Sequence, residues 1–328
     1  MKDTRAATTR IQSHQVLVCY LCGSQGKLIH EGVRDLLFGV PGNWSFRVCP
    51  NSECGLMWLD PTPLDQEISK AYAQYYTHGE AVVRRGRIVD ALRKRVSSVL
   101  LWASPLRRER KRLSLMYLDN RKPGKLLDVG CGNGVRLAQL RTLGWDVHGQ
   151  DVDAVAVGYA RDNFGIEAHL AALEDIGFAG ESFDCVTLNH VIEHVPDPIR
   201  LITECRRILR KNGVLVVVTP NASSFAHKHF GRFWRGLEPP RHFHLFSPKT
   251  LSTVAARSGF LDYKSWTSVA HAKLFGYGSL LIKGGGLSSG FTSRLLRRSY
   301  IMGHVCRSMV EHARDANSGE ECVLWAIK

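Results

Sequence analysis

The sequence contains no apolar run of about 18 residues, the length that a membrane-spanning helix needs. Its polar first ten residues also lack the apolar core of a signal peptide. Acidic residues are scarce, because 30 Asp and Glu stand against 44 Lys and Arg and give a net charge of +14. Nine cysteines in a chain without an export signal favour a reducing compartment over a disulfide framework. We therefore expect a cytoplasmic protein that has an anionic partner.

The positive charge is concentrated in one stretch. Residues 81–125 hold 14 Lys and Arg against three acidic residues. Apolar residues recur there at helical spacing, which predicts a basic amphipathic helix. These residues are Ile88, Leu92, Val96, Val99 and Leu100. The helix could pack on the remainder of the protein or lie at the inner face of a membrane, and the alternative is a solvated helical face.

From Lys125 onward, strand-like and helix-like segments alternate, which predicts a parallel sheet with crossover helices. We place strands near 125–129, 145–150, 167–170, 183–188, 213–219, 260–268 and 321–328, and helices near 134–143, 153–163, 198–211 and 247–258. The fold class is therefore α/β, a Rossmann-like, doubly wound and mostly parallel sheet of seven strands.

The domain organisation follows from changes in composition along the chain. We expect a disordered tail over 1–15, a small cysteine-containing module over 16–62 and a basic helical segment over 63–122. The α/β domain then covers 123–328. It includes an insertion over 269–318 that carries one basic amphipathic helix around Thr292 to Ala313.

A glycine-rich turn joins the first strand to the first helix of the α/β domain. The turn begins at Asp128, and its glycines at 130, 132 and 134 allow a sharp turn and a close approach of backbone to ligand. A second acid, Asp151, ends the next strand, where it could accept both ribose hydroxyls of a nucleoside. Dinucleotide enzymes use a similar turn, and an ordinary strand–turn–helix without cofactor is the simplest alternative.

This arrangement resembles the S-adenosylmethionine site of class I methyltransferases. The resemblance implies a fixed set of cofactor-binding positions, with Glu174 at the adenine ring and Asn189 at the methionine end. The full set is Asp128, Gly130, Cys131, Gly132, Gly134, Asp151, Glu174 and Asn189.

The segment Glu193-His-Val-Pro-Asp-Pro198 resembles that of quinone-biosynthesis O-methyltransferases. Methyl transfer to a hydroxyl needs in-line geometry and a base, and a histidine titrates in the right range. His194 and His190 are therefore candidate bases, and the alternative is that Glu193 and His194 cap and position the following loop. Some quinone methyltransferases bind a divalent metal through acids and a histidine here, and His190 at the upstream acid position argues against that metal.

Four cysteines lie in two pairs near the N-terminus, Cys19 with Cys22 and Cys49 with Cys54. Two such pairs suit a tetrahedral thiolate site for structural Zn²⁺, although the second spacing is wider than usual. The segment is similar to the cysteine modules that precede some bacterial methyltransferase domains, including sugar C-methyltransferases. The alternative is four cysteines without a metal.

A run rich in aromatic and basic residues, Phe230 to Phe246, follows the fifth strand. Similar runs occur in bacterial glycan-cluster methyltransferases, which implies a wall of the acceptor site. The candidate substrate-binding residues are Arg232, Trp234, Arg235, Arg241 and His244, and His242 is a third candidate base. The alternative is a packed segment with its aromatic rings turned inward.

The leading hypothesis is an S-adenosylmethionine-dependent methyltransferase that modifies an oxygen of a small or a glycan- or lipid-linked acceptor. The alternatives are an RNA methyltransferase, a sugar C-methyltransferase and an inactive binding module with the same fold. Nucleic acid is the less favoured partner, because Asn189-His-Val-Ile192 differs from the motif typical of base amine methylation.

Overall fold

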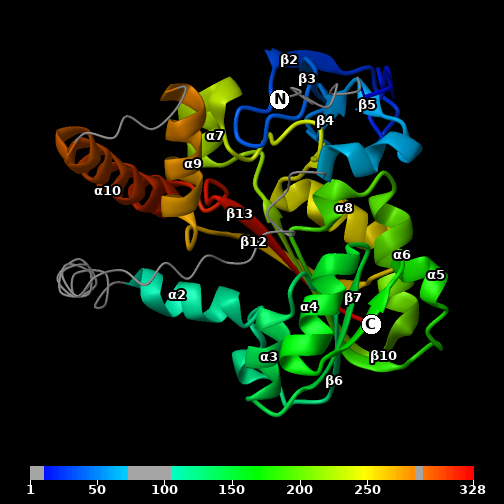
Figure 1. The fold of residues 1–328 in the computed structure, drawn as a ribbon. Coiled ribbons are helices and arrows are strands. Elements are labelled where there is room, and N and C mark those ends of the chain that lie inside the picture. The colour runs from blue at the N-terminus through cyan, green and yellow to red at the C-terminus, as the bar shows by residue number, and fades with distance from the viewer. Residues whose placement is uncertain (1–10, 73–104, 285–290) are drawn as a thin grey trace, which may run out of the picture.

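A computed structural model describes residues 11–72, 105–284 and 291–328. A seven-stranded sheet forms its centre, with the strand order β12-β13-β10-β9-β6-β7-β8 (Figure 1). β13 is antiparallel to both of its neighbours, and the other pairs in the sheet are parallel. The strands are β6 (Lys125–Val129), β7 (Asp146–Asp151), β8 (Glu167–Leu170), β9 (Phe183–Asn189), β10 (Leu209–Pro220), β12 (Asp262–Ser268) and β13 (Glu321–Ile327). The predicted fold class is confirmed.

Helices cover both faces of this sheet, because its strands are apolar on both sides. Leu126, Val214 and Val216 face a core shared with α3 (Val135–Arg141) and α4 (Ala154–Phe164). Alternate residues on the same strands, such as Leu127 and Leu215, face the opposite core. Helices α6 (Pro198–Ile208) and α8 (Pro248–Arg257) lie on that second face, and the short α5 (Leu173–Ile176) packs against α6.

The N-terminal segment is joined to the α/β domain through a shared strand. Its sheet has the order β11-β4-β3-β2, and β11 comes from the aromatic–basic run far along the chain. These strands are β2 (Lys27–Val33), β3 (Trp44–Val48), β4 (Met57–Asp60) and β11 (His244–Leu245). Cys19, Cys49 and Trp58 also belong to the same apolar cluster as α6 and α8. The N-terminal sheet therefore packs as part of the larger domain.

A second apolar cluster lies between the N-terminal sheet and the segments that follow β10. It brings Phe46 and Leu59 against Phe230, Trp234 and Phe275. The segments involved are α7 (Phe225–Phe230), the 3₁₀ turn η5 (Gly231–Phe233) and α9 (Ala272–Gly284), and α10 (Phe291–Arg314) packs on α9. The predicted insertion thus carries two helices where one was expected.

Residues 11–15 correct the expected disordered tail. Ile11 is buried, and β1 (Ser13–His14) pairs with β5 (Thr62–Pro63). Residues 1–10 lie outside the described part of the chain, as does the predicted basic helix with Ile88 and Leu92. Of the segment expected to be helical, the structure describes η1 (Asp65–Tyr72), α2 (Pro105–Ser114) and η3 (Leu118–Asn120).

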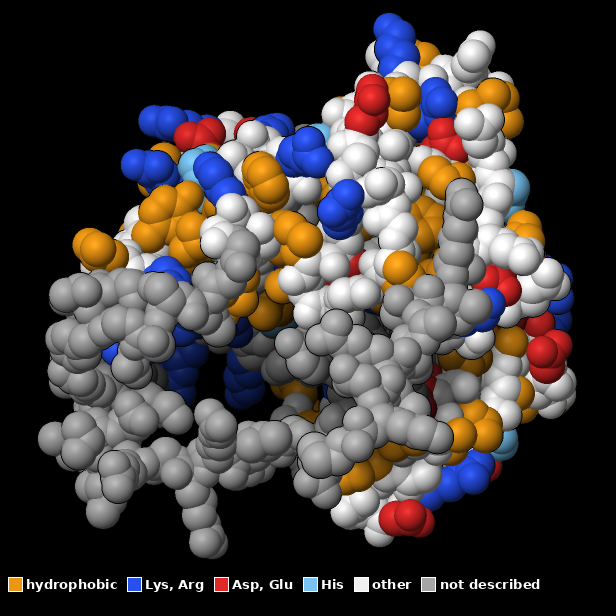
Figure 2. Space-filling model, turned by 45° about the horizontal axis from the view of Figure 1, so that its top comes forward, with side chains coloured by type: hydrophobic (Ala, Val, Ile, Leu, Met, Phe, Trp, Pro, Cys, Tyr) orange, Lys and Arg blue, Asp and Glu red, His pale blue; other side chains and the backbone are white. Residues whose placement is uncertain are grey.

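Among the described residues, none of the helices has the length and apolar character needed to cross a bilayer. Exposed apolar side chains do occur on α9 and α10, including Leu274, Tyr277, Leu296 and Met302. Figure 2 shows one face of the molecule, on which apolar side chains are interspersed with Lys and Arg. The predicted membrane contact through the basic helix stays a prediction.

Candidate functional site

The glycine turn leaves β6 at the carboxyl edge of the sheet. Gly130, Gly132 and Gly134 have φ angles of 67°, 56° and 75°, a region that side chains rarely adopt. A Cβ at Gly130 would lie 2.3 Å from Val191 Cγ2, and one at Gly134 would lie 2.8 Å from Ala160 Cβ. A Cβ at Gly132 would meet no described atom within 4 Å. Two glycines therefore serve packing, whereas Gly132 borders open space.

The two predicted carboxylates lie beside this turn. Asp128 is buried and accepts a hydrogen bond from the Thr187 hydroxyl at 2.6 Å, and burial raises its pKa to about 6. Asp151 Oδ2 accepts from the Gly132 N–H at 2.8 Å. Cys131 N donates to the Gln150 carbonyl at 2.9 Å, which fixes the turn to β7. Asp151, at the end of β7, thus contacts Gly132, the glycine that borders open space.

The other predicted cofactor contacts are at the same edge. Asn189 is the last residue of β9 and is half-buried. Glu174 lies in the first turn of α5, half-buried, with one carboxylate oxygen 3.8 Å from Arg200 Nε. Their contacts with adenine and methionine stay predictions.

His190 follows β9 directly and lies between two buried carboxylates. Its Nδ1 is 3.1 Å from Glu193 Oε1, and its Nε2 is 2.9 Å from Glu321 Oε1. Burial alone would lower its pKa, but hydrogen bonds and charge from Glu193 and Glu321 outweigh burial and raise the pKa to about 9. As long as no cation is bound between these groups, His190 is therefore protonated at neutral pH, which disfavours it as the base.

His194 and His242 are the better base candidates. His194 Nδ1 donates to the Arg241 carbonyl at 3.1 Å and lies 2.9 Å from the Tyr72 hydroxyl. His242 Nδ1 donates to the Gly236 carbonyl at 2.7 Å. A proton on Nδ1 leaves the lone pair on Nε2 in both rings, whose centroids are 4.6 Å apart. Burial lowers both pKa values, so both rings are neutral at pH 7.

The predicted acceptor wall is largely packed inside the molecule. Arg241 is 1% exposed, and its guanidinium donates to Asp35, Glu238 and the Ala71 carbonyl. Trp234 is 1% exposed, and its ring stacks with those of His227 and Phe275. These contacts favour the alternative of a packed segment with inward aromatic rings.

The remaining residues of that run differ in exposure. Arg235 is ion-paired with Glu238, and buried His244 donates from Nε2 to the Pro196 carbonyl at 3.1 Å. Arg232 is exposed and borders a surface cavity of about 470 Å³ together with Arg34 and Asn43. None of the residues that line this cavity belongs to the glycine turn or to 190–194, so methyl transfer is not placed in it.

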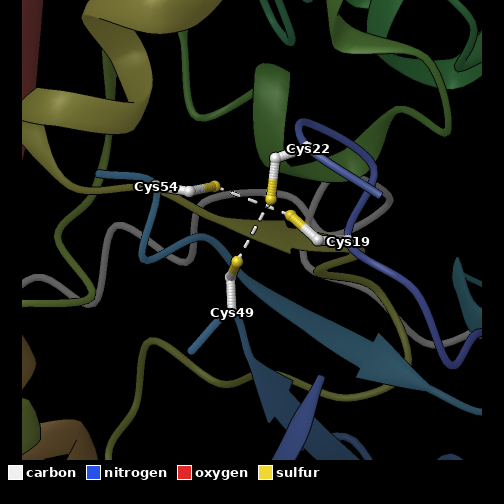
Figure 3. Close-up of side chains that lie close together, drawn as sticks. All are labelled: Cys19, Cys22, Cys49 and Cys54. Carbon is white, nitrogen blue, oxygen red and sulfur yellow. Dashed lines mark hydrogen bonds between the residues drawn. The ribbon is translucent and has the colours of Figure 1, made fainter. Parts of the chain in front are cut away.

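The four predicted metal-binding cysteines converge, as Figure 3 shows. The Sγ atoms of Cys19 and Cys54 are 3.6 Å apart, and those of Cys22 and Cys49 are 3.3 Å apart. Along the chain, Cys19 and Cys22 lie in one tight turn, and Cys49 and Cys54 lie in another. Each turn ends in a glycine with positive φ, Gly23 in the first and Gly55 in the second. Four sulfur atoms held this close fit a tetrahedral Zn²⁺ site, in which all four would be thiolate ligands.

Three residues that contact the candidate sites were not singled out from the sequence, one beside the cysteine quartet and two beside His190. Tyr20, within the first cysteine turn, donates to Asp197 Oδ1 at the start of α6. His271 and Glu321 lie beside His190, with His271 Nδ1 2.9 Å from Glu321 Oε1. No local pattern marks them, because each meets its partner only through the contact of distant segments. Sheet pairing of β13 with β10 and β12 brings Glu321 and His271 to His190. Glu321 is paired with Pro220 and Ser268 at the ends of β10 and β12.

Comparison with known proteins agrees with this geometry. The model of a family described as "Methyltransferase domain" matches residues 102–264. A "Ubiquinone biosynthesis O-methyltransferase" from Cereibacter sphaeroides (strain ATCC 17025) is 37% identical over 117 residues, which are 34% of this chain and 47% of the relative. A protein of the same name from Thiobacillus denitrificans is 34% identical over 122 residues, 34% of this chain and 52% of the relative. The chain thus spans about half the length of these curated relatives.

Among solved structures, a Thermotoga maritima protein described as an S-adenosylmethionine-dependent methyltransferase and possible histamine N-methyltransferase is similar, with a TM-score of 0.46 and 19% identity. The similarity covers 71% of this chain and 96% of that one. From the strand order, the glycine turn and the matching family model, the chain contains a methyltransferase domain of the class I, S-adenosylmethionine-dependent superfamily.

Proposed function

We propose that this chain is an S-adenosylmethionine-dependent methyltransferase that transfers the methyl group to an oxygen atom of a small acceptor. One observation carries the proposal: neutral His194 and His242 lie at the same sheet edge as the glycine turn. The contact between Val191 and the Gly130 position holds the 190–194 loop against that turn. The names of the relatives, which are O-methyltransferases, support the choice of oxygen.

The proposed chemistry needs few groups from the protein. The Asp151 carboxylate would bind the ribose hydroxyls, and the space beside Gly132 would admit the cofactor backbone. A neutral histidine would take the proton from the acceptor hydroxyl as its oxygen attacks the sulfonium methyl group. Low histidine pKa values keep the basic form populated at neutral pH.

We also propose that Cys19, Cys22, Cys49 and Cys54 bind one structural Zn²⁺ ion. Support comes from the convergence of the four sulfur atoms and from the small size of the surrounding segment. A small segment of this kind gains much of its stability from metal coordination. The Tyr20–Asp197 contact would then transmit the order of the cysteine turns to the start of α6.

The experiment that tests the proposed function combines binding with product analysis. Calorimetry should show stoichiometric S-adenosylmethionine binding to the purified chain. Incubation with methyl-labelled cofactor and a panel of phenols, phosphorylated sugars and glycolipids should then give a product heavier by one methylene and stable as an ether. Absence of cofactor binding would instead support the inactive binding module. A label on carbon would support a sugar C-methyltransferase, and a label in RNA would support an RNA methyltransferase.

Gly132 provides a direct test of the cofactor site. Gly132→Ala should weaken S-adenosylmethionine binding at least about tenfold, because the methyl group enters the open space beside the turn. Gly165→Ala is the matched control, since Gly165 has a similar φ of 58°, equally open surroundings and a place at the far end of α4. Calorimetry of both variants checks the prediction, and equal affinities would place the cofactor elsewhere.

Arg232 tests whether the surface cavity contributes to acceptor binding. If its guanidinium holds an anionic part of the acceptor, Arg232→Ala should raise the acceptor KM severalfold and leave cofactor affinity unchanged. The effect should shrink at high salt, because this side chain is exposed. Arg257→Ala, an exposed change on α8, is the control. An unchanged KM would remove the cavity from the acceptor site.

A further inference from the structure

Three side chains from distant segments converge beside the end of β9. His190 follows β9, His271 precedes α9, and Glu321 begins β13. Glu321 Oε1 lies 2.9 Å from His190 Nε2 and 2.9 Å from His271 Nδ1. One potential ligand atom from each residue lies within 4.8 Å of the others. Two imidazole nitrogens and one carboxylate oxygen thus point to a common position.

The carboxylate of Glu321 has an unusual environment. Its side chain is fully buried, yet Oε2 has no hydrogen-bond partner among the described residues. A buried carboxylate oxygen without a hydrogen-bond partner destabilises the folded state, because the charge has lost its hydration without compensation. A cation bound by this carboxylate would remove that destabilisation. The His190 and His271 side chains are 31% and 41% exposed, so both imidazoles are partly accessible to solvent.

Surrounding groups hold His190 in the orientation that a ligand needs. Glu193 Oε1 accepts from His190 Nδ1 at 3.1 Å, and Glu193 Oε2 accepts from the Thr219 hydroxyl at 2.9 Å. A carboxylate behind a histidine is the usual support of a metal-binding imidazole, since it fixes the tautomer that leaves Nε2 as the ligand atom. The backbone of His190 has a φ of 55°, a strained conformation for a non-glycine residue. Its N–H donates to the Val218 carbonyl at 2.8 Å, which helps to hold this conformation.

We propose that His190 Nε2, His271 Nδ1 and the Glu321 carboxylate bind a divalent transition-metal ion. Two histidines and one carboxylate are a common ligand set for such ions and leave coordination positions open for another molecule. Two of the three ligands come from outside the 190–194 segment, so this set differs from the acids and histidine through which some quinone methyltransferases bind metal.

The role of the ion rests on the proposed O-methyltransferase function. Bound at an open coordination position, the acceptor hydroxyl would be more acidic, because the cation stabilises the developing alkoxide. The hydroxyl proton would pass to a neutral histidine, the oxygen lone pair would form the C–O bond, and the C–S pair would return to sulfur. The products are the methyl ether, S-adenosylhomocysteine and the protonated histidine.

Cobalt(II) is a suitable probe for this site in the full chain with zinc already supplied. Absorption spectroscopy separates the two sites, because cobalt at the cysteine quartet would give thiolate charge-transfer bands and cobalt at the proposed site would not. Calorimetry should show about one Co²⁺ bound per chain with a nitrogen–oxygen spectrum. His271→Ala and Glu321→Gln should each lower that affinity by at least roughly 10–100-fold.

His229→Ala is the matched control, since this histidine of α7 lies outside the proposed ligand set, and it should bind cobalt as the unaltered chain does. Equal affinity in His271→Ala, which changes a partly exposed side chain, would overturn the proposal, as would the lack of stoichiometric binding by the unaltered chain. S-adenosylmethionine binding in the same samples separates the two ideas. If the chain binds S-adenosylmethionine but not cobalt, only the proposed metal site is contradicted. If it binds cobalt but not S-adenosylmethionine, only the proposed methyltransferase function is contradicted.

Discussion

Replacing His194 with alanine is expected to lower kcat by about 10²–10⁴-fold, the usual contribution of a general base. The reason is the lone pair on Nε2, which the hydrogen bond from Nδ1 to the Arg241 carbonyl leaves available. Burial lowers the pKa of His194 below its ordinary value of 6.5, so the unaltered protein should lose activity only on the acidic side of that value. In the variant, activity should recover partly at high pH, where acceptor hydroxyls ionise without help.

One conservative variant, His194→Asn, separates catalysis by His194 from a role in positioning. The amide nitrogen of His194→Asn can replace Nδ1 and keep the bond to the Arg241 carbonyl, but it leaves nothing at Nε2. If Nε2 of His194 is the base, His194→Asn should lower kcat as much as His194→Ala does. Near-normal turnover in His194→Asn would instead make His194 a positioning residue. His242→Ala, measured in parallel, would then show whether the neighbouring ring is the base.

Loss of the cysteine quartet is expected to have the largest effect on stability. The double variant Cys22→Ser with Cys54→Ser should lose about one zinc per chain, because both cysteine pairs are broken. Metal coordination supplies apparent free energies of roughly 10–16 kcal/mol in small zinc-binding peptides, so the N-terminal segment should unfold at a much lower temperature. Elemental analysis and thermal denaturation measure the two effects.

Cys306→Ser is the control for that variant. Cys306 is an exposed cysteine of α10 outside the quartet, so its replacement should change neither metal content nor melting temperature. The quartet variant should also lose activity, since Tyr20 would no longer hold Asp197 at the start of α6. Zinc retained at full stoichiometry in the double variant would contradict the assignment of these ligands.

Local patterns were sufficient for the central sheet and for the glycine turn. Parallel strands that are buried on both faces have continuous apolar sequences, as β10 has over residues 214–218. The helix predicted near 247–258 also corresponds to α8, which begins after Ser247, whose hydroxyl accepts from Thr250 N. The spacing of the cysteines likewise predicted that their four sulfur atoms converge, as they do in the structure. In each case the information lies within a few residues.

Helix α9 was missed because its glycines resemble helix breakers. A Cβ at Gly276 would lie 2.3 Å from His304 Cδ2, and one at Gly278 would lie 2.8 Å from Arg235 Cδ. These glycines therefore permit close packing of α9 against α10 and the 230–246 run, a purpose that only the tertiary contacts reveal. Arg241 was misread for a related reason. Its partner Asp35 lies 206 residues away in sequence, so nothing nearby indicates a buried ion pair.

The strand pairing between β11 and β4 has a consequence for protein engineering and for evolution by recombination. A fragment cut to residues 102–264 would contain His244 and Leu245 without their partners Trp58 and Met57. It would expose a strand edge and an apolar surface that favour aggregation. The N-terminal segment therefore cannot be exchanged between relatives as an independent cassette. Any functional chimera must inherit residues 57–60 together with the 230–246 run.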